Sequence, residues 1–189
     1  LFLTKEQALW YLLKKNHKKI KKMSTYNASL TVIPSNDYNL PQPGLLKTGS
    51  AAAGSNTTTL VDSSAEFTNA KTNALGYNIS SGDIIYNKTQ SKCYQVKNIV
   101  SDTTITIATA GVAIATNDVY EIYKGNVAGS EGYSLYFGTT GDVKITDVSG
   151  NTTTINNIPA GKILDLQVVK VFASSPTPPI DIVLLDKLD

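Results

Sequence analysis

The chain has 189 residues but no arginine, one histidine and one cysteine, and these shortages exclude several kinds of chemistry. Cys93 cannot form an intrachain disulfide, so the fold is not a small disulfide-stabilised scaffold. His17 lies among lysines near the start, so the body of the chain can build neither a Ser-His-Asp triad nor a zinc site of the usual Cys/His type. Without arginine, the planar guanidinium that often binds phosphate or guanine through paired hydrogen bonds is missing. We therefore expect no cofactor and no metal ion.

The charge is divided unevenly along the chain, although its net value is only +2. Seven lysines and one glutamate give residues 1–22 a charge of +6, whereas ten lysines and fourteen acids give residues 23–189 a charge of −4. The mildly acidic body disfavours nucleic acid as a specific ligand. Met23, the only methionine, stands at the boundary. Either an N-terminal piece was removed in the natural protein, or Met23 is the natural start.

The basic segment has the signals of a short amphipathic helix. Thr4 can cap it, Gln7 can complete a capping box, and residues 8–13 are good apolar helix formers. The apolar run is too short to span a bilayer, which needs about 20 residues, so we expect no membrane insertion. One interpretation is an anchor that binds an acidic surface on a partner, and the other is a solvated helix end or a product of the start site. The anchor would consist of Trp10, Leu12, Leu13, Lys18 and Lys19.

The rest of the chain is predicted to be all-β, because short stretches of alternating apolar residues are separated by Gly, Asn, Asp, Ser and Pro. The one candidate helix in this part covers residues 64–73. The expected strands are 29–33, 57–61, 83–87, 92–99, 104–108, 119–124, 133–137, 142–147, 152–156, 163–173 and 180–185. The spacing within 57–124 favours an antiparallel barrel of about five strands. In 162–173 the apolar residues predict a long core strand that is partly buried on both faces.

Residues with catalytic potential are scarce. The sequence Gly138-Thr-Thr-Gly141 is too short for a phosphate-binding loop, lacks its lysine and precedes a strand, so we interpret it as a hairpin turn. Single acids stand at strand starts and turns, where aspartate commonly stabilises the turn itself. They are Asp62, Asp83, Asp118, Asp142 and Asp147. Taken alone, the residues predict a non-catalytic β protein with no catalytic, cofactor-binding or metal-binding residue.

A succession of motifs in the C-terminal part points to a known family. An aromatic strand is followed by a Gly-x-x-Gly-Asp hairpin, a short Thr/Val strand, an Ile-Pro-Ala-Gly turn, a long apolar strand and a final Ile-Val strand. This order resembles the head-spike base proteins of tailed phages and gene transfer agents. The chain departs from that pattern at Gln167 and Lys170, where the family commonly has arginine, and in the proline-rich loop 174–179. The matching turn residues are Pro34, Asp37, Leu40, Pro41, Gly138, Gly141, Asp142, Pro159 and Gly161.

The resemblance is interrupted in the middle of the chain. Residues 32–41 are similar to a Pro-Ser-Asp-x-x-Asp-Leu-Pro segment that directly precedes the aromatic strand in that family, but here residues 44–129 intervene. Parts of the intervening segment resemble a small β-barrel module that recurs in phage structural proteins. The resemblance therefore implies three parts. They are an N-terminal helical arm (1–23), a spike-base-like β-sandwich (24–43 plus 130–189) and an inserted small antiparallel β-barrel (44–129).

These features lead us to expect a non-enzymatic structural protein of a tailed-phage virion, located on the capsid surface as a decoration, cement or head-spike base protein. It would form a homo-oligomer and bind the major capsid protein or other virion proteins. The alternative is a carbohydrate-binding module that contacts host glycans, which predicts coplanar exposed aromatic side chains on the 57–124 unit. A glycan-cleaving spike enzyme would instead require two acids facing each other in a groove.

Overall fold

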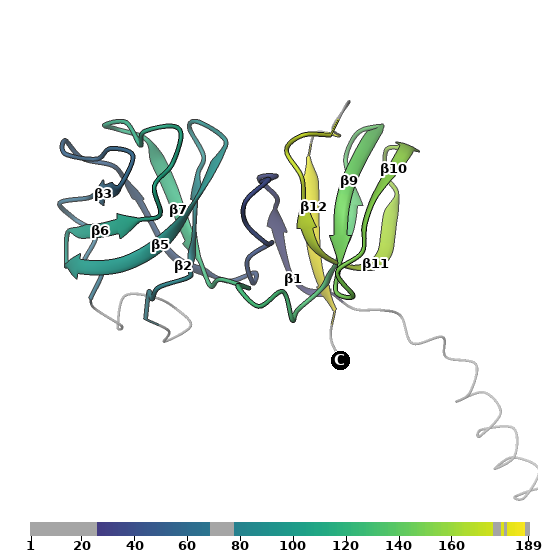
Figure 1. The fold of residues 1–189 in the computed structure, drawn as a ribbon, viewed down its shortest axis with the longest axis horizontal. Coiled ribbons are helices and arrows are strands. Elements are labelled where there is room, and N and C mark those ends of the chain that lie inside the picture. The colour runs from purple at the N-terminus through teal and green to yellow at the C-terminus, as the bar shows by residue number, and fades with distance from the viewer. Residues whose placement is uncertain (1–25, 69–77, 176–178, 180, 188–189) are drawn as a thin grey trace, which may run out of the picture.

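The computed structural model describes residues 26–68, 78–175, 179 and 181–187, and this part of the chain contains strands, turns and loops but no helix. Two antiparallel sheets of six strands each lie side by side (Figure 1). The described fold is therefore all-β, as predicted. The strands are β1 (Tyr26–Thr31), β2 (Leu45–Ser50), β3 (Thr59–Val61), β4 (Ile84–Asn87), β5 (Lys92–Ser101), β6 (Thr104–Ile107), β7 (Val119–Tyr123), β8 (Tyr133–Phe137), β9 (Gly141–Asp147), β10 (Thr152–Ile158), β11 (Ile163–Val171) and β12 (Ile182–Lys187).

The first sheet has the strand order β1-β12-β8-β11-β9-β10. β9 alternates buried and partly exposed residues, as expected for a strand with one face on a core. β11 changes its partner along its length: Leu164 lies opposite Leu135 of β8, whereas Val171 lies opposite Ile145 of β9. β11 therefore joins the half of the sheet formed by β1, β12 and β8 to the half formed by β9 and β10.

The second sheet has the strand order β2-β7-β4-β5-β6-β3 and curls into a half-barrel (Figure 1). The ten-residue strand β5 makes this curl, because it pairs with β4 at its start and with β6 from Val96 to Ser101, and the pairing with β6 contains two register shifts. The side chains inside the curl include five that are completely buried. These are Leu60, Ile85, Ile105, Tyr120 and Ile122.

The two sheets are not consecutive in the sequence. β1 belongs to the same sheet as β8–β12, while β2–β7 form the other sheet. The register pairs Tyr26 with Lys187, so the first and last described strands are neighbours. Among the described residues, no helix is long and apolar enough to cross a membrane.

Three sequence predictions need correction. β2 was not expected, because Leu45-Leu46-Lys47 shows no alternation, and its pairing with β7 raises the strand number of this sheet from about five to six. The predicted core strand β11 is buried only in its second half, since Ile163 and Leu166 are 40% and 37% exposed. Residues 64–68 of the candidate helix form turns, and the remainder of that candidate lies outside the described residues.

Candidate functional site

Two connectors join the sheets, residues 32–44 before β2 and residues 124–132 after β7. They are hydrogen-bonded to each other: the Gln42 backbone N–H donates to the Lys124 carbonyl at 2.8 Å. The Gln42 side-chain amide also donates to the Glu131 carboxylate at 3.1 Å. The chain therefore leaves the first sheet and returns to it through a single braced junction.

The first connector is fixed to β11 of the first sheet. The Ser35 N–H donates to the Val171 carbonyl at 2.9 Å, and the Leu40 N–H donates to the Val169 carbonyl at 2.7 Å. The Leu40 side chain is 3% exposed and belongs to the core of the first sheet. Backbone pairing and burial together hold this connector in one position.

The second connector is fixed to the second sheet by the buried carboxylate of Asp83. Lys124 forms an ion pair with Asp83 at 3.1 Å, and the Gly125 N–H donates to the same carboxylate at 3.0 Å. The other oxygen accepts the Ser80 N–H at 2.8 Å. Gly125 also approaches the Gly82 carbonyl so closely that a Cβ atom at position 125 would lie 2.0 Å from that oxygen. Only glycine permits this contact.

Apolar side chains from both sheets meet at the junction. Ile84, Tyr86 and Tyr123 of the second sheet belong to the same buried cluster as Leu135 and Phe137 of the first sheet. The Tyr86 and Tyr123 rings pack at 5.5 Å between centroids. A continuous core therefore crosses the junction between the two sheets.

The single cysteine lies at this junction. The Cys93 thiol donates to the Ile33 carbonyl at 3.2 Å. Burial raises the pKa of Cys93 to about 12, the nearby Lys92 opposing this shift. The thiol is therefore protonated at neutral pH, which is unfavourable for a nucleophile.

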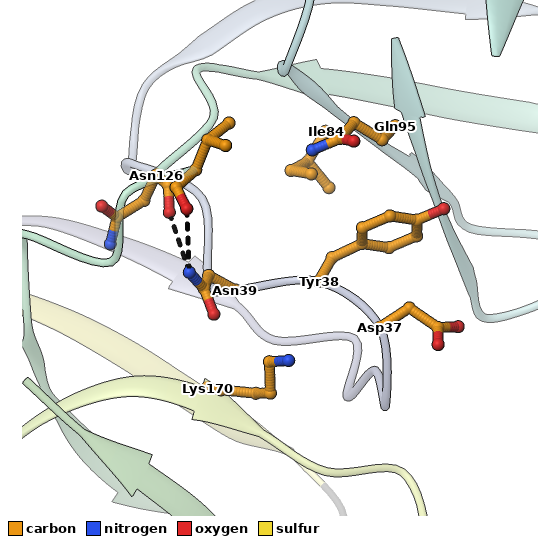
Figure 2. Close-up of a pocket in the computed structure, with 8 residues that line it drawn as sticks. Asp37, Tyr38, Asn39, Ile84, Gln95, Asn126 and Lys170 are labelled. Carbon is orange, nitrogen blue, oxygen red and sulfur yellow. Dashed lines mark hydrogen bonds between the residues drawn. The ribbon is translucent and has the colours of Figure 1, made fainter. Parts of the chain in front are cut away.

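A cleft of about 310 Å³ opens where the connectors meet the sheets (Figure 2). Its wall is held by Asn39, whose side-chain amide donates to the carbonyls of Asn126 at 3.1 Å and Val127 at 3.4 Å. Asn126 is itself buried and donates to the Glu131 carbonyl at 2.6 Å. The cleft is lined by Asp37, Tyr38, Asn39, Ile84, Gln95, Asn126, Val127 and Lys170.

Two polar groups of the cleft are not used by the fold, and a third, Lys170, retains hydrogen-bonding capacity. In the part of the chain that the structure describes, no hydrogen bond reaches the Asp37 carboxylate or the Gln95 side-chain amide. Lys170 makes one long hydrogen bond of 3.5 Å to the Asn36 carbonyl, and its ammonium group lies 5.6 Å from the centre of the Phe172 ring. A ligand can therefore bind the Asp37 carboxylate as an acceptor, the Lys170 ammonium group as a donor, and the Gln95 amide as both.

A second surface of interest is the open edge of the first sheet. β10 ends the strand order and pairs only with β9. Of its residues only Ile158 is buried, and its sequence contains no charge. Elsewhere on the first sheet, exposed apolar side chains are Val148, after β9, and Ile163 and Leu166 on β11. Edge strands are usually protected by charges, by proline or by a covering segment, so an uncharged exposed edge is available for pairing.

Comparison of the chain with protein-family models, with curated proteins and with solved structures found no match. Within the described ranges, no three His, Cys, Asp or Glu side chains gather into a group that could hold a metal ion.

The residues carried by the family resemblance fall at two places. Pro34, Asp37, Leu40 and Pro41 lie in the first connector, and of these only Asp37 lines the cleft. The other five residues lie at or beside the β8–β9 turn and the β10–β11 turn, which contact each other. They are Gly138, Gly141, Asp142, Pro159 and Gly161. There the Gly161 N–H donates to the Phe137 carbonyl at 2.8 Å, and the Asn157 N–H donates to the Asp142 carboxylate at 2.8 Å. The candidate anchor Trp10, Leu12, Leu13, Lys18 and Lys19 lies outside the described residues, as does the predicted helical arm 1–23.

The exposed aromatic face that the glycan-binding alternative predicts on the 57–124 unit does not form among the described tyrosines. Tyr86, Tyr94 and Tyr120 are at most 1% exposed, and Tyr123 is 7% exposed. Their rings fill the cores, while the hydroxyl groups of Tyr120 and Tyr123 donate to Asp62 and Glu121. Tyrosine suits these core positions, because its ring is buried while its hydroxyl group forms a hydrogen bond inside the sheet.

Sequence reasoning missed the other residues of the cleft. Asn39, Gln95, Asn126 and Lys170 are isolated polar residues from four segments, and no spacing in the sequence connects them. The predicted turn acids Asp62, Asp83 and Asp118 do stabilise their turns, because they accept the backbone N–H groups of Ser64, Ser80 and Ala115 respectively. They do so from buried positions, since they are 2%, 1% and 4% exposed.

Proposed function

We propose that this chain is a non-enzymatic structural protein of a tailed-phage virion, which acts on the capsid surface as a decoration, cement or head-spike base protein. In this proposal the first sheet is a β-sandwich of the spike-base type, bent at β11, and the second is a small barrel inserted between β1 and β8. The strand order supports this division, because each sheet is complete without a strand from the other.

The observation that carries the proposal is the uncharged open edge of β10. A second copy of the chain can pair its own β10 with this edge in the antiparallel direction, which satisfies the outward-facing backbone groups of both copies. A two-fold axis would pass through the interface, so each residue would face its symmetry-related counterpart. The first sheet also exposes the apolar side chains of Val148, after β9, and of Ile163 and Leu166 on β11, which would provide further contacts to the capsid lattice.

The double variant Thr152→Lys/Thr154→Lys tests the assembly function. Both side chains are exposed, so the fold is retained, while four like charges would face one another across the paired edges. In sedimentation velocity of the full chain, we expect a concentration-dependent oligomer for the wild type and a monomer for the variant. The matched control is Thr109→Lys/Thr116→Lys, which adds the same charge to exposed loop positions and should assemble normally.

Capsids of the encoding phage that lack this protein provide the second measurement. The wild type and the loop control should bind them to saturation, and the β10 variant should lose most of its occupancy because assembly multiplies weak contacts. A wild-type chain that remains monomeric and does not bind these capsids would show that the assembly function is wrong.

A further inference from the structure

We propose that the cleft at the junction of the two sheets binds a neutral oligosaccharide. This site is separate from the β10 edge, so it does not depend on the assembly function. The inference rests on three properties of the cleft: walls that are already in place, polar groups with free hydrogen-bonding capacity, and an apolar surface beside them (Figure 2).

The walls are in place before any ligand arrives. Asn39 bridges from the first connector to the backbone of the second through hydrogen bonds of 3.1 and 3.4 Å. The connectors are themselves fixed to β11 and to Asp83. Most small-molecule sites are largely preformed and lie where domains or sheets meet, and about 300 Å³ is the lower end of their size range. The cleft volume of about 310 Å³ therefore fits one or two sugar rings.

The unused polar groups favour hydroxyl groups over charged ligands. A sugar hydroxyl both donates and accepts, so it can bind an acceptor-only carboxylate, a donor-only ammonium group or an amide that does both. Asp37, Lys170 and Gln95 supply one group of each kind. Within this cleft one carboxylate and one ammonium group are present, so Asp37 would repel an anion while Lys170 would repel a cation. A neutral ligand with many hydroxyl groups meets neither penalty.

The apolar part of the cleft matches the C–H face of a sugar ring. The Tyr38 side chain is partly buried against the core of the junction, and Ile84 lies opposite it in the cleft (Figure 2). Val127 adds an aliphatic side chain that is 64% exposed. Ile84 is only 3% exposed and closes the floor of the cleft. The Tyr38 ring and the Val127 side chain, beside the polar groups, give a surface on which one face of a pyranose can pack while its rim makes hydrogen bonds.

A neighbouring hollow extends the site beyond one or two rings. It has a volume of about 340 Å³ and shares Asp37 and Tyr38 with the first cleft. Its other lining includes Lys92 and the exposed Val112. Asp37 and Tyr38 therefore form a ridge between two hollows, and a chain of sugars can cross it. The affinity should rise from a monosaccharide to a trisaccharide.

The test is a titration of the ¹⁵N-labelled full chain with glucose, cellotriose, maltotriose and triacetylchitotriose, followed by backbone NMR chemical shifts. We expect at least one trisaccharide to shift the signals of Tyr38, Asn39 and Gln95 with a Kd of about 1 mM, a typical value for a shallow polar site. Glucose should bind at least about threefold more weakly. Tri-galacturonic acid, an anionic trisaccharide, serves as the charged comparison.

The variant Gln95→Ala removes one ligand-facing amide, and we expect it to weaken trisaccharide binding about fivefold, the value of one hydrogen bond. Gln167→Ala is the matched control, because this exposed glutamine lies outside both hollows and should leave the Kd unchanged. A well-dispersed spectrum establishes that each variant is folded. The proposal is overturned if no neutral trisaccharide shifts the cleft signals, if Gln95→Ala binds like the wild type, or if tri-galacturonic acid binds more tightly than every neutral sugar.

Discussion

The buried pair of Tyr120 and Asp62 is expected to be a main source of stability in the second sheet. The Tyr120 hydroxyl donates to the Asp62 carboxylate at 2.6 Å, and both residues are at most 2% exposed. The other carboxylate oxygen accepts the backbone and hydroxyl hydrogens of Ser64, each at 2.9 Å. The pair thus ties β7 to the loop that follows β3.

Tyr120→Phe removes the hydroxyl group and keeps the ring in the core. A hydrogen bond to a charged group contributes about 1.5–3 kcal/mol, so we expect the free energy of unfolding to fall by about 2 kcal/mol at neutral pH. Urea denaturation monitored by far-ultraviolet circular dichroism measures this loss. Ser64 still binds Asp62 in the variant, so the fold should persist.

The loss should depend on pH. Burial raises the pKa of Asp62, but hydrogen bonds from Tyr120, Ser64 and the Ser50 backbone outweigh it, so the pKa lies below its ordinary value. A carboxylate with a lowered pKa stabilises the fold fully above its unfolded pKa of about 3.9, and this stabilisation disappears as the pH falls through the folded value. The difference between wild type and Tyr120→Phe should therefore shrink as the pH falls below the unfolded pKa of about 3.9.

Tyr94→Phe provides the matched control. Tyr94 is also 1% exposed, but its hydroxyl donates to the neutral amide oxygen of Gln90 over a long 3.4 Å. Its loss should cost about 1 kcal/mol or less. The reasoning is refuted if the two variants lose equal stability, or if the Tyr120→Phe loss is as large at acid pH as at neutral pH.

Two further predictions concern the junction. Gly125→Ala places a Cβ atom 2.0 Å from the Gly82 carbonyl, so the second connector must move, and we expect a loss of about 1–3 kcal/mol in urea denaturation. Gly111→Ala, where a Cβ would meet nothing within 4 Å, should stay within about 0.5 kcal/mol of the wild type, and equal losses in both variants would contradict the close approach at Gly125. Because the pKa of Cys93 is about 12, its alkylation by iodoacetamide near pH 8 should be roughly a thousandfold slower in the native protein than in urea. Similar rates in the two states would show that the pKa of the Cys93 thiol is not raised by the fold.

Strands that have one buried face and one exposed face were predictable from the sequence. β6 and β9 alternate buried and partly exposed residues, and this alternation can be read directly from Thr104–Ile107 and Gly141–Asp147. β2 could not be found in this way, because its second leucine, Leu46, is buried while Leu45 is 42% exposed, and the following Lys-Thr-Gly has no apolar period. Its position depends on pairing with β7, which is distant in sequence.

The cleft could not be predicted, because its chemistry arises from the folding of one connector onto another. Asp37 is part of a turn motif in the sequence, but the residues that line the cleft with it include Gln95 of β5 and Lys170 of β11, which are distant in sequence. The role of Asp83 was hidden for the same reason, since its ion-pair partner Lys124 comes after four further strands. Tertiary contacts of this kind leave no local pattern.

The pairing of β1 with β12 determines the order in which the protein can fold. β2–β7 are contiguous in sequence, so the second sheet can form as soon as residue 123 has left the ribosome. β1 must wait for β12, because Tyr26 pairs with Lys187 near the end of the chain. The braced junction brings the two ends of the inserted segment together, so that a folded second sheet shortens the effective loop between β1 and β8. Synthesis should therefore proceed through an intermediate with a finished second sheet and an unpaired β1, and C-terminal truncation should trap it.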